Sequence, residues 1–322
     1  SSTGAAIVAG TKNYLKGSED SSITAGIENS GIDSTGSSIL AGTSNSISGS
    51  VDSSINAGTS NSLSGSEDSS INAGIENSIT DSTGSAIAAG KENLLINSED
   101  SSIFVGQKNI VESSKRSCVG AGSGNYISAD SSFIGAGQSN LIHKEKSAIL
   151  AGQNNVVSGN HSIVGGGFMN EGFGENSSIL GGKNNFIGEN TDSASILGGR
   201  QNEVTKGNQS ALLGGRDNTI SGSFSSLVGG SGNSIFGDGI ISLGGESNTV
   251  SGKYTTLFAG QNNEAVGTAS TIVAGRNNQL LNSDDSVVNA GTKNYINDSK
   301  DSSIAAGIEN SGIKSTGFSI AA

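Results

Sequence analysis

A glycine followed three residues later by an asparagine recurs from one end of this 322-residue chain to the other. Successive glycines lie sixteen positions apart from Gly10 to Gly122 and mostly fifteen apart after that, with one step of seventeen between Gly182 and Gly199. We call these residues the turn glycines: Gly10, Gly26, Gly42, Gly58, Gly74, Gly90, Gly106, Gly122, Gly137, Gly152, Gly167, Gly182, Gly199, Gly215, Gly230, Gly245, Gly260, Gly275, Gly291 and Gly307. So short a fixed period constrains the fold more than any other feature of the sequence.

Large aliphatic residues keep a constant phase with the turn glycine. One usually stands three residues before it, as at Ile39 and Ile55, and another five residues after it, as at Ile47 and Leu63. Glycine (50), serine (61) and asparagine (34) together make up 145 of the 322 residues, a composition that by itself is typical of a disordered linker. A linker has no reason to keep apolar residues in register, so the order of the residues excludes disorder.

A repeat of this length predicts one coil of a parallel β-solenoid or β-roll, because it has room for two short strands and two turns. Alternation along each strand then places the aliphatic residues inward and their neighbours outward. The fold class predicted is therefore all-β, with about twenty stacked coils. The absence of proline agrees with this, since proline would remove a hydrogen bond from the stack.

Glycine and asparagine have separate roles in the predicted turn. Glycine adopts positive φ and permits close approach of neighbouring coils, whereas asparagine tolerates the left-handed region and bonds its own turn backbone. Stacked in register, the asparagines are expected to form a ladder of side-chain amides. Representative pairs of this turn ladder are Gly42 and Asn45, Gly152 and Asn155, Gly182 and Asn185, Gly215 and Asn218, and Gly260 and Asn263.

The sequence also contains a second, longer repeat that spans many coils. Residues 9–41 return almost unchanged at 290–322, eighteen coils further along the chain. We expect residues 1–322 to form a single continuous repeat domain, and the sequence to be a fragment of a longer array of similar blocks.

The segments 37–42 (Ser-Ser-Ile-Leu-Ala-Gly), 176–182 (Asn-Ser-Ser-Ile-Leu-Gly-Gly) and 210–222 resemble head repeats of the YadA-like trimeric autotransporter adhesins, in their Gly-Gly-x-x-Asn subtype. The resemblance covers essentially the whole chain. It implies a left-handed parallel β-roll, three chains in one head, and a non-enzymatic adhesive role on the bacterial surface. No neck, heptad stalk or membrane anchor of that family is present in these residues, so trimer formation and anchoring are implied by the likeness alone.

The residue two positions before the turn glycine should point outward, yet in the second half it is apolar. This candidate interface stripe consists of Leu150, Leu180, Leu197, Leu213, Val228, Leu243, Phe258 and Val273. In the first half the same position is often polar or small, as at Thr24, Asn56, Asn72 and Ala88. A lone soluble rod should not expose such a stripe. Burial against another chain, a broader core in these coils, and a ligand or receptor patch are the three explanations.

Catalytic and metal-binding patterns are absent from the sequence. One cysteine, Cys118, and two histidines, His143 and His161, do not make a zinc site of any standard spacing. We expect Cys118 to be a small buried residue and His143 to be a solvated residue in a charged turn. No serine lies in a nucleophile elbow, and the glycines do not form a phosphate loop. We therefore expect no enzyme activity, no cofactor and no metal.

The formal net charge of −12 argues against nucleic acid as a partner, and no apolar stretch is long enough to insert in a membrane. Acidic residues gather in the turn before the first strand. A charged edge that blocks lateral aggregation explains them better than calcium does, because the calcium-binding nonapeptide motif is missing. They are Glu19, Asp20, Asp52, Glu67, Asp68, Glu99, Asp100, Asp130, Asp284, Asp285 and Asp301.

Three functions are consistent with these patterns. The first is an extracellular fibre or adhesin head on a bacterial cell surface, associating with itself as a homotrimer and contacting a host or neighbouring cell. The second is a self-assembling structural filament or matrix protein, favoured by the longer repeat that returns residues 9–41 at 290–322. The third is a phage fibre shaft. All three functions would use a stiff repetitive rod that presents many copies of one surface.

Overall fold

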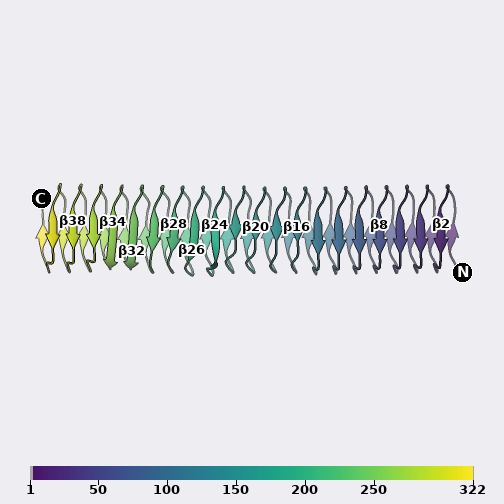
Figure 1. Cartoon of the computed structure of the whole chain (residues 1–322), viewed down its shortest axis with the longest axis horizontal. Coiled ribbons are helices and arrows are strands. Elements are labelled where there is room, and N and C mark those ends of the chain that lie inside the picture. The colour runs from purple at the N-terminus through teal and green to yellow at the C-terminus, as the bar shows by residue number, and fades with distance from the viewer. Residues whose placement is uncertain (1–2, 322) are drawn as a thin grey trace. The chain divides into compact units, whose positions relative to one another are not determined.

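The computed structural model describes residues 3–321 and divides the chain into two compact units, Ser1–Val157 (unit 1) and Ser158–Ala322 (unit 2). Within each unit the chain forms coils that follow one another in sequence order (Figure 1). Each coil contributes a first strand, which ends three residues before the turn glycine, and a second strand beyond it. The residues described contain strands, bridges and turns but no helix. The all-β parallel solenoid of about twenty coils is thus confirmed.

The first strands carry the odd numbers. In unit 1 they are β1 (Ala6–Ile7), β3 (Ser22–Ile23), β5 (Ser38–Ile39), β7 (Ser54–Ile55), β9 (Ser70–Ile71), β11 (Ala86–Ile87), β13 (Ser102–Ile103), β15 (Cys118–Val119), β17 (Phe133–Ile134) and β19 (Ala148–Ile149). In unit 2 they are β21 (Ile163–Val164), β23 (Ser178–Ile179), β25 (Ser195–Ile196), β27 (Ala211–Leu212), β29 (Ser226–Leu227), β31 (Ile241–Ser242), β33 (Thr256–Leu257), β35 (Thr271–Ile272), β37 (Val287–Val288), β39 (Ser303–Ile304) and β41 (Ser319–Ile320).

The second strands carry the even numbers. In unit 1 they are β2 (Tyr14–Lys16), β4 (Ser30–Ile32), β6 (Ser46–Ser48), β8 (Ser62–Ser64), β10 (Ser78–Thr80), β12 (Leu94–Ile96), β14 (Ile110–Glu112), β16 (Tyr126–Ile127), β18 (Leu141–Ile142) and β20 (Val156–Val157). In unit 2 they are β22 (Glu171–Gly172), β24 (Phe186–Asn190), β26 (Glu203–Lys206), β28 (Thr219–Ser221), β30 (Ser234–Phe236), β32 (Thr249–Lys253), β34 (Glu264–Thr268), β36 (Gln279–Leu281), β38 (Tyr295–Asn297) and β40 (Ser311–Ile313).

Every strand pairs in parallel with its counterpart one coil away, so identical positions of the repeat lie beside each other. Ile39 of β5 is the partner of Ile55 of β7, and Ile47 of β6 is the partner of Leu63 of β8. Both turns add isolated parallel bridges, such as Thr43 with Thr59. In the coils up to Lys115 the stack therefore has four ladders of backbone pairing, compared with the two that the strands alone predict.

The core of one coil is two apolar side chains and three polar ones. In the coil around Gly42, Ile39 and Ile47 are about 1% exposed, and Asn45, Ser50 and Ser53 are equally buried. Strands of two or three residues can turn only one or two side chains inward, so the turns supply the remaining inward positions. The predicted inward direction of the aliphatic residues is confirmed.

The asparagine ladder is continuous within each unit. The Nδ2 atom of Asn61 donates to Oδ1 of Asn45 at 3.1 Å and to the carbonyl oxygen of Gly74 at 3.0 Å. The backbone N–H of Asn61 also donates to Oδ1 of Asn45, at 3.0 Å. Each amide thus joins three coils, and a buried amide with all its partners in place stabilises the stack instead of costing free energy.

In the coils up to Ser114, two further ladders of buried serine hydroxyls run beside the amides. Oγ of Ser53 donates to the carbonyl of Val51 at 2.9 Å and accepts the backbone N–H of Ser69 at 3.3 Å. Ser50 and Ser66 repeat the arrangement at the other inward serine position. The sequence shows that these serines lie next to the strands, and the structure explains why. Their hydroxyls form hydrogen bonds with backbone groups that the tight second turn leaves unpaired.

The expected conformation of the turn asparagine is wrong in one respect. The left-handed residue is its predecessor, as at Ser44 (φ 56°), whereas the asparagines of the ladder have negative φ. The turn glycine itself has positive φ, as at Gly42 (φ 113°), and a Cβ there would overlap the carbonyl oxygen of Gly58 in the following coil. Position within the coil, rather than residue preference, selects the left-handed residue, since Lys12 and Glu28 also adopt it.

The longer and shorter coils differ in their second turn. A longer coil has two left-handed residues there, such as Gly49 (φ 57°) and Asp52 (φ 47°). In the shorter coil from Gly137 to Gly152 only one remains, Lys146 (φ 55°). The turn next to the asparagine ladder is unchanged, so the removal of one residue leaves both strand ladders in register.

Candidate functional surfaces

The predicted turn ladder lies where the sequence put it. Asn45, Asn155, Asn185, Asn218 and Asn263 are at most 1% exposed, and their turn glycines Gly42, Gly152, Gly182, Gly215 and Gly260 all have positive φ. These residues are structural. The asparagine amides are not available to a ligand, because they form hydrogen bonds with the neighbouring coils.

The candidate interface stripe is exposed in both units. Leu150 lies in unit 1 and is 48% exposed. The other seven residues occupy seven consecutive coils of unit 2: Leu180, Leu197, Leu213, Val228, Leu243 and Phe258 are exposed, and Val273 is half-buried. Backbone hydrogen bonds such as that from Leu197 N–H to the carbonyl of Leu212 (3.0 Å) keep them one coil apart. The side chains are outside the core, so a broader core does not explain them.

Glycine rather than alanine stands beside the stripe. Gly181, Gly198 and Gly214 each lie between a stripe leucine and a turn glycine, and a Cβ built on any of them meets no atom within 4 Å. In unit 1 this position is usually alanine, as at Ala41 and Ala57. The fold of a single chain thus gives no steric reason for these glycines. Because they have no side chain, the surface next to the stripe leucines stays uncovered.

Unit 1 also exposes three other large apolar side chains at the stripe position. Val8 is 71% exposed, Leu40 is 46% exposed and Phe104 is 56% exposed, whereas Thr24, Asn56, Asn72 and Ala88 are polar or small, as the sequence indicated. Val8 and Leu40 are two coils apart, and Leu40 and Phe104 are four coils apart, so they form no stripe.

A second surface in unit 2 consists of three cations immediately after the turn glycines. We call Lys183, Arg200 and Arg216 the cation row, and all three are exposed. Parallel bridges pair Lys183 with Arg200, and Arg200 with Arg216. The ammonium of Lys183 lies over the ring of Phe168, 5.2 Å from its centroid. The row was not evident from the sequence because a whole coil of chain separates its members, and only the register of the coils brings them together.

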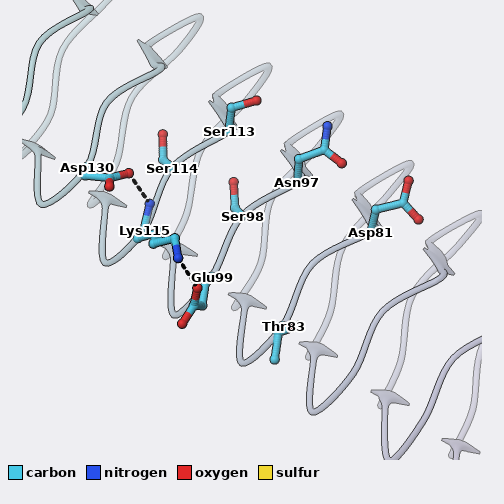
Figure 2. Close-up of a pocket in the computed structure, with 9 residues that line it drawn as sticks. All are labelled: Asp81, Thr83, Asn97, Ser98, Glu99, Ser113, Ser114, Lys115 and Asp130. Carbon is cyan, nitrogen blue, oxygen red and sulfur yellow. Dashed lines mark hydrogen bonds and ion pairs between the residues drawn. The ribbon is translucent and has the colours of Figure 1, made fainter.

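Unit 1 has a shallow notch at the corner where the longer coils give way to the shorter ones. Figure 2 shows its opposite rims, with Asp81, Asn97 and Ser113 on one side and Thr83, Glu99 and Lys115 on the other; Ser98, Ser114 and Asp130 complete the lining. The Nζ atom of Lys115 is 2.8 Å from Glu99, and its backbone N–H donates to Asp130 at 2.8 Å. A hydrogen bond with Glu99 and its negative charge raise the pKa of Lys115. The cation of this notch is therefore already paired.

His143 belongs to a small side-chain network on the second-strand face. Its Nδ1 atom is 3.1 Å from Oγ of Ser128, and its ring lies edge-on to Tyr126, whose hydroxyl donates to Glu112 at 2.8 Å. Burial and the hydrogen bond to Glu112 raise the pKa of Tyr126. His143 is solvent-exposed as expected, but it has partners that the sequence did not indicate. The partner of the His143 Nδ1 atom is thus a serine hydroxyl, whereas in a catalytic triad it is a carboxylate.

Cys118 is not the buried residue that the sequence predicts. It is the outward member of β15 and is half-buried, whereas its neighbour Val119 fills the core. Burial against adjacent coils raises the pKa of the Cys118 thiol, with a hydrogen bond to Ser102 opposing the shift. A raised pKa keeps the thiol protonated and weakly nucleophilic near neutral pH.

Metal ligands do not converge in the part of the chain that the structure describes. Residues 3–321 contain no group of three or more His, Cys, Asp or Glu side chains able to hold an ion. His161 occupies a left-handed position in a second turn, with φ 55°. The acidic residues of the second turn, such as Asp52 and Asp68, are exposed along the edge of unit 1, which agrees with the expectation of a charged edge.

Residues 3–321 include no helix with the length and apolar character that a membrane span requires.

The comparisons with known proteins identify no family. No family model matches the chain, and no curated protein matches it. Among solved structures it is similar to a UDP-N-acetylglucosamine acyltransferase from Campylobacter jejuni, with 15% identity, 52% of this chain covered and a TM-score of 0.21. A proposed acetyltransferase from Desulfovibrio desulfuricans G20 gives 12% identity, 79% coverage and a TM-score of 0.15. The chain spans 66% of the length of each, and neither likeness is close enough to carry an argument.

Proposed function

We propose that this chain is a non-enzymatic extracellular fibre or adhesin head, a stiff repetitive support displayed on a bacterial cell surface. The observation that carries the proposal is the unbroken ladder of buried asparagine amides, each bonded to the coils on both sides of it. To separate two coils, a pulling force must break backbone pairs, amide bonds and serine bonds together. A surface protein that must hold a load benefits from such stacking.

The second part of the proposal is self-association, as a homotrimer of left-handed rolls in line with the YadA-like resemblance. The exposed stripe from Leu180 to Val273 supports it. Six coil steps of about 4.8 Å give this stripe a length of about 29 Å. Monomeric soluble proteins rarely keep so regular an apolar surface in water. The bare glycines Gly181, Gly198 and Gly214 beside the stripe would allow the leucines of another copy to approach closely.

Sedimentation equilibrium of residues 1–322 at micromolar concentration tests self-association. We expect a trimer for the unaltered chain and a monomer for the double variant Leu197→Ser/Leu213→Ser. Leu40→Ser is the matched control, because Leu40 has the same position and a similar exposure (46%) but no apolar neighbours at that position. An unaltered chain that sediments as a monomer contradicts the trimer.

Adhesion is tested separately, by displaying the chain on beads or on a non-adherent bacterium and counting attachment to host-cell and abiotic surfaces. Attachment above that of beads coated with an unrelated protein supports the adhesin. Absence of attachment, together with growth of threads seen by electron microscopy, supports the alternative of a self-assembling filament or matrix protein. The return of residues 9–41 at 290–322 is the observation that favours this alternative.

A further inference from the structure

The cation row of unit 2 places like charges directly beside one another. Lys183, Arg200 and Arg216 are successive partners in one ladder of parallel bridges. Like charges at directly opposed positions of a β-ladder destabilise it. Among the isolated bridges formed by residues 3–321, only these two join a cation to a cation. The row therefore costs stability that the fold itself does not require.

At four other sites the stack places a carboxylate beside the cation. Four lysines in the described residues form ion pairs with a glutamate one coil away: Lys12 with Glu28 (2.8 Å), Lys108 with Glu92 (3.4 Å), Lys115 with Glu99 (2.8 Å) and Lys293 with Glu309 (2.9 Å). The cation row differs from these four sites, because its neighbours in the ladder are other cations instead of glutamates.

The immediate partners of the row leave most of its charge free. Arg200 donates through Nε to the neutral amide of Gln201 at 2.8 Å, and Lys183 lies over the ring of Phe168. Only Arg216 has a carboxylate, Asp217, with Nε 3.0 Å from Oδ2, and both of these side chains are well exposed. Three cations and one acid give a local charge of +2 on a chain whose net charge is −12.

The chemistry of these side chains favours an anionic ligand. A guanidinium presents a planar fork of N–H donors that matches the oxygens of a carboxylate or a sulfate. Arg200 and Arg216 are neighbours in the ladder, and Lys183 adds a third positive charge one coil away.

From this geometry we infer that the cation row binds an extended acidic polysaccharide lying along unit 2, with its carboxylate or sulfate groups against successive coils. The row spans two coil steps, about 10 Å. That length suits a short stretch of a linear chain with regularly spaced charges. It is too short for nucleic acid, whose binding usually neutralises about six to ten phosphates, and it has fewer cations than the four to eight of a polybasic membrane site.

The inference names a ligand class for the proposed adhesive function, and it therefore rests on that function. Self-association and stiffness involve other residues, so they stand whether or not the row binds a polysaccharide. Adhesion through another ligand would also leave the proposed function intact.

Surface plasmon resonance on immobilised heparin (sulfated) and alginate (carboxylated) tests the inference at low ionic strength. The unaltered chain should bind at least one of them, and Arg200→Gln should weaken binding about tenfold, the effect of losing one charge-assisted contact. Asp217→Asn should strengthen binding, because it frees Arg216. The matched control is Lys293→Gln, an exposed lysine of the same unit that is already paired with Glu309, and it should bind like the unaltered chain.

Three results would overturn the inference. One is failure of the unaltered chain to bind both polysaccharides while the bead assay still shows attachment, which would place adhesion elsewhere. Another is an equal loss for Arg200→Gln and Lys293→Gln, which would indicate general charge attraction. The third is stronger binding to vesicles containing anionic lipid, or to single-stranded DNA, than to either polysaccharide. Circular dichroism confirms that each variant keeps the fold.

Discussion

Units 1 and 2 share one backbone plan but differ in what they present to solvent. Unit 1 has alanine before most turn glycines, mixed residues at the stripe position, and exposed carboxylates such as Asp52 and Asp68 at its second turn. Unit 2 has Gly-Gly turns, the apolar stripe and the cation row. The ladder positions are the same in both. The inward residues of the coil therefore maintain the fold, while the outward residues are free to diverge and carry function.

The core also differs at one coil of unit 2. Ile240 and Ser242 are both fully buried, with isoleucine at an inward position that normally holds serine and serine where the first strand normally places an aliphatic residue. The Oγ atom of Ser242 is the single buried side-chain polar atom without a partner in the part of the chain that the structure describes. Unit 1 keeps an aliphatic residue at this strand position in each of its coils.

The largest expected effect concerns the two glycines of a Gly-Gly turn. Gly215→Ala should lower the free energy of unfolding by about 4 kcal/mol, because φ is 93° and the new Cβ would overlap the carbonyl oxygen of Gly230. Gly214→Ala should be neutral or stabilising by up to about 1 kcal/mol, since its Cβ meets nothing. Urea unfolding followed by circular dichroism measures both. Equal losses would show that the first glycine is structural after all.

The next effect tests whether the ladder is common to both units. Asn61→Ala in unit 1 and Asn233→Ala in unit 2 should each cost about 3 kcal/mol, because each removes several buried hydrogen bonds and leaves an adjacent amide unsatisfied. Ser62→Ala, at the outward position next to Asn61, is the control and should change little. A loss confined to one unit would mean that the other does not depend on its amides.

A smaller effect of opposite sign is expected at the irregular coil. Ser242→Ala should raise the free energy of unfolding by about 1 kcal/mol, because it removes a buried hydroxyl that has no hydrogen-bond partner. Ser226→Ala, a half-buried outward residue of β29, provides the comparison. Thermal melting distinguishes the two, and a lower melting temperature for Ser242→Ala would reveal a partner for the hydroxyl.

The smallest effect concerns the reactivity of Cys118 in unit 1. Because burial raises the pKa of its thiol, the fraction of thiolate at pH 8 should be lower than for a free cysteine, and alkylation by iodoacetamide correspondingly slower. Rates should converge as the pH rises above the raised pKa. Mass spectrometry of the folded chain against the same chain in urea measures this, and equal rates at pH 8 would contradict the shift.

Much of the fold was predictable because the repeat is exact at the positions that matter. The phase of Ile39, Asn45 and Ile47 with Gly42 predicted the inward residues and the amide ladder, which require only alternation and stacking. The left-handed residue Ser44 was missed, since no residue type marks that position. Cys118 was predicted to be buried because its apolar character was given more weight than its position relative to the turn glycine. Val119 holds the inward position.

The candidate surfaces were predictable only in part. The stripe follows from phase alone, so Leu180 and Leu197 were correctly expected to point outward. The cation row and the network around His143 needed the register between coils, which places residues a whole coil apart in the sequence beside one another. The single-domain prediction for residues 1–322, the handedness and the trimer stay predictions.

The sequence by itself determined the coil, its period and its inward residues. This is because a residue repeated in phase lies beside the same type of residue in the next coil. Tertiary structure decided which outward residues meet, which glycines are sterically required and which cations remain unpaired. These depend on atoms from adjacent coils, and a difference of one residue in coil length changes which side chains lie together. Gly214 and Gly215 are identical in the sequence, yet only the second has a neighbouring coil against its missing Cβ.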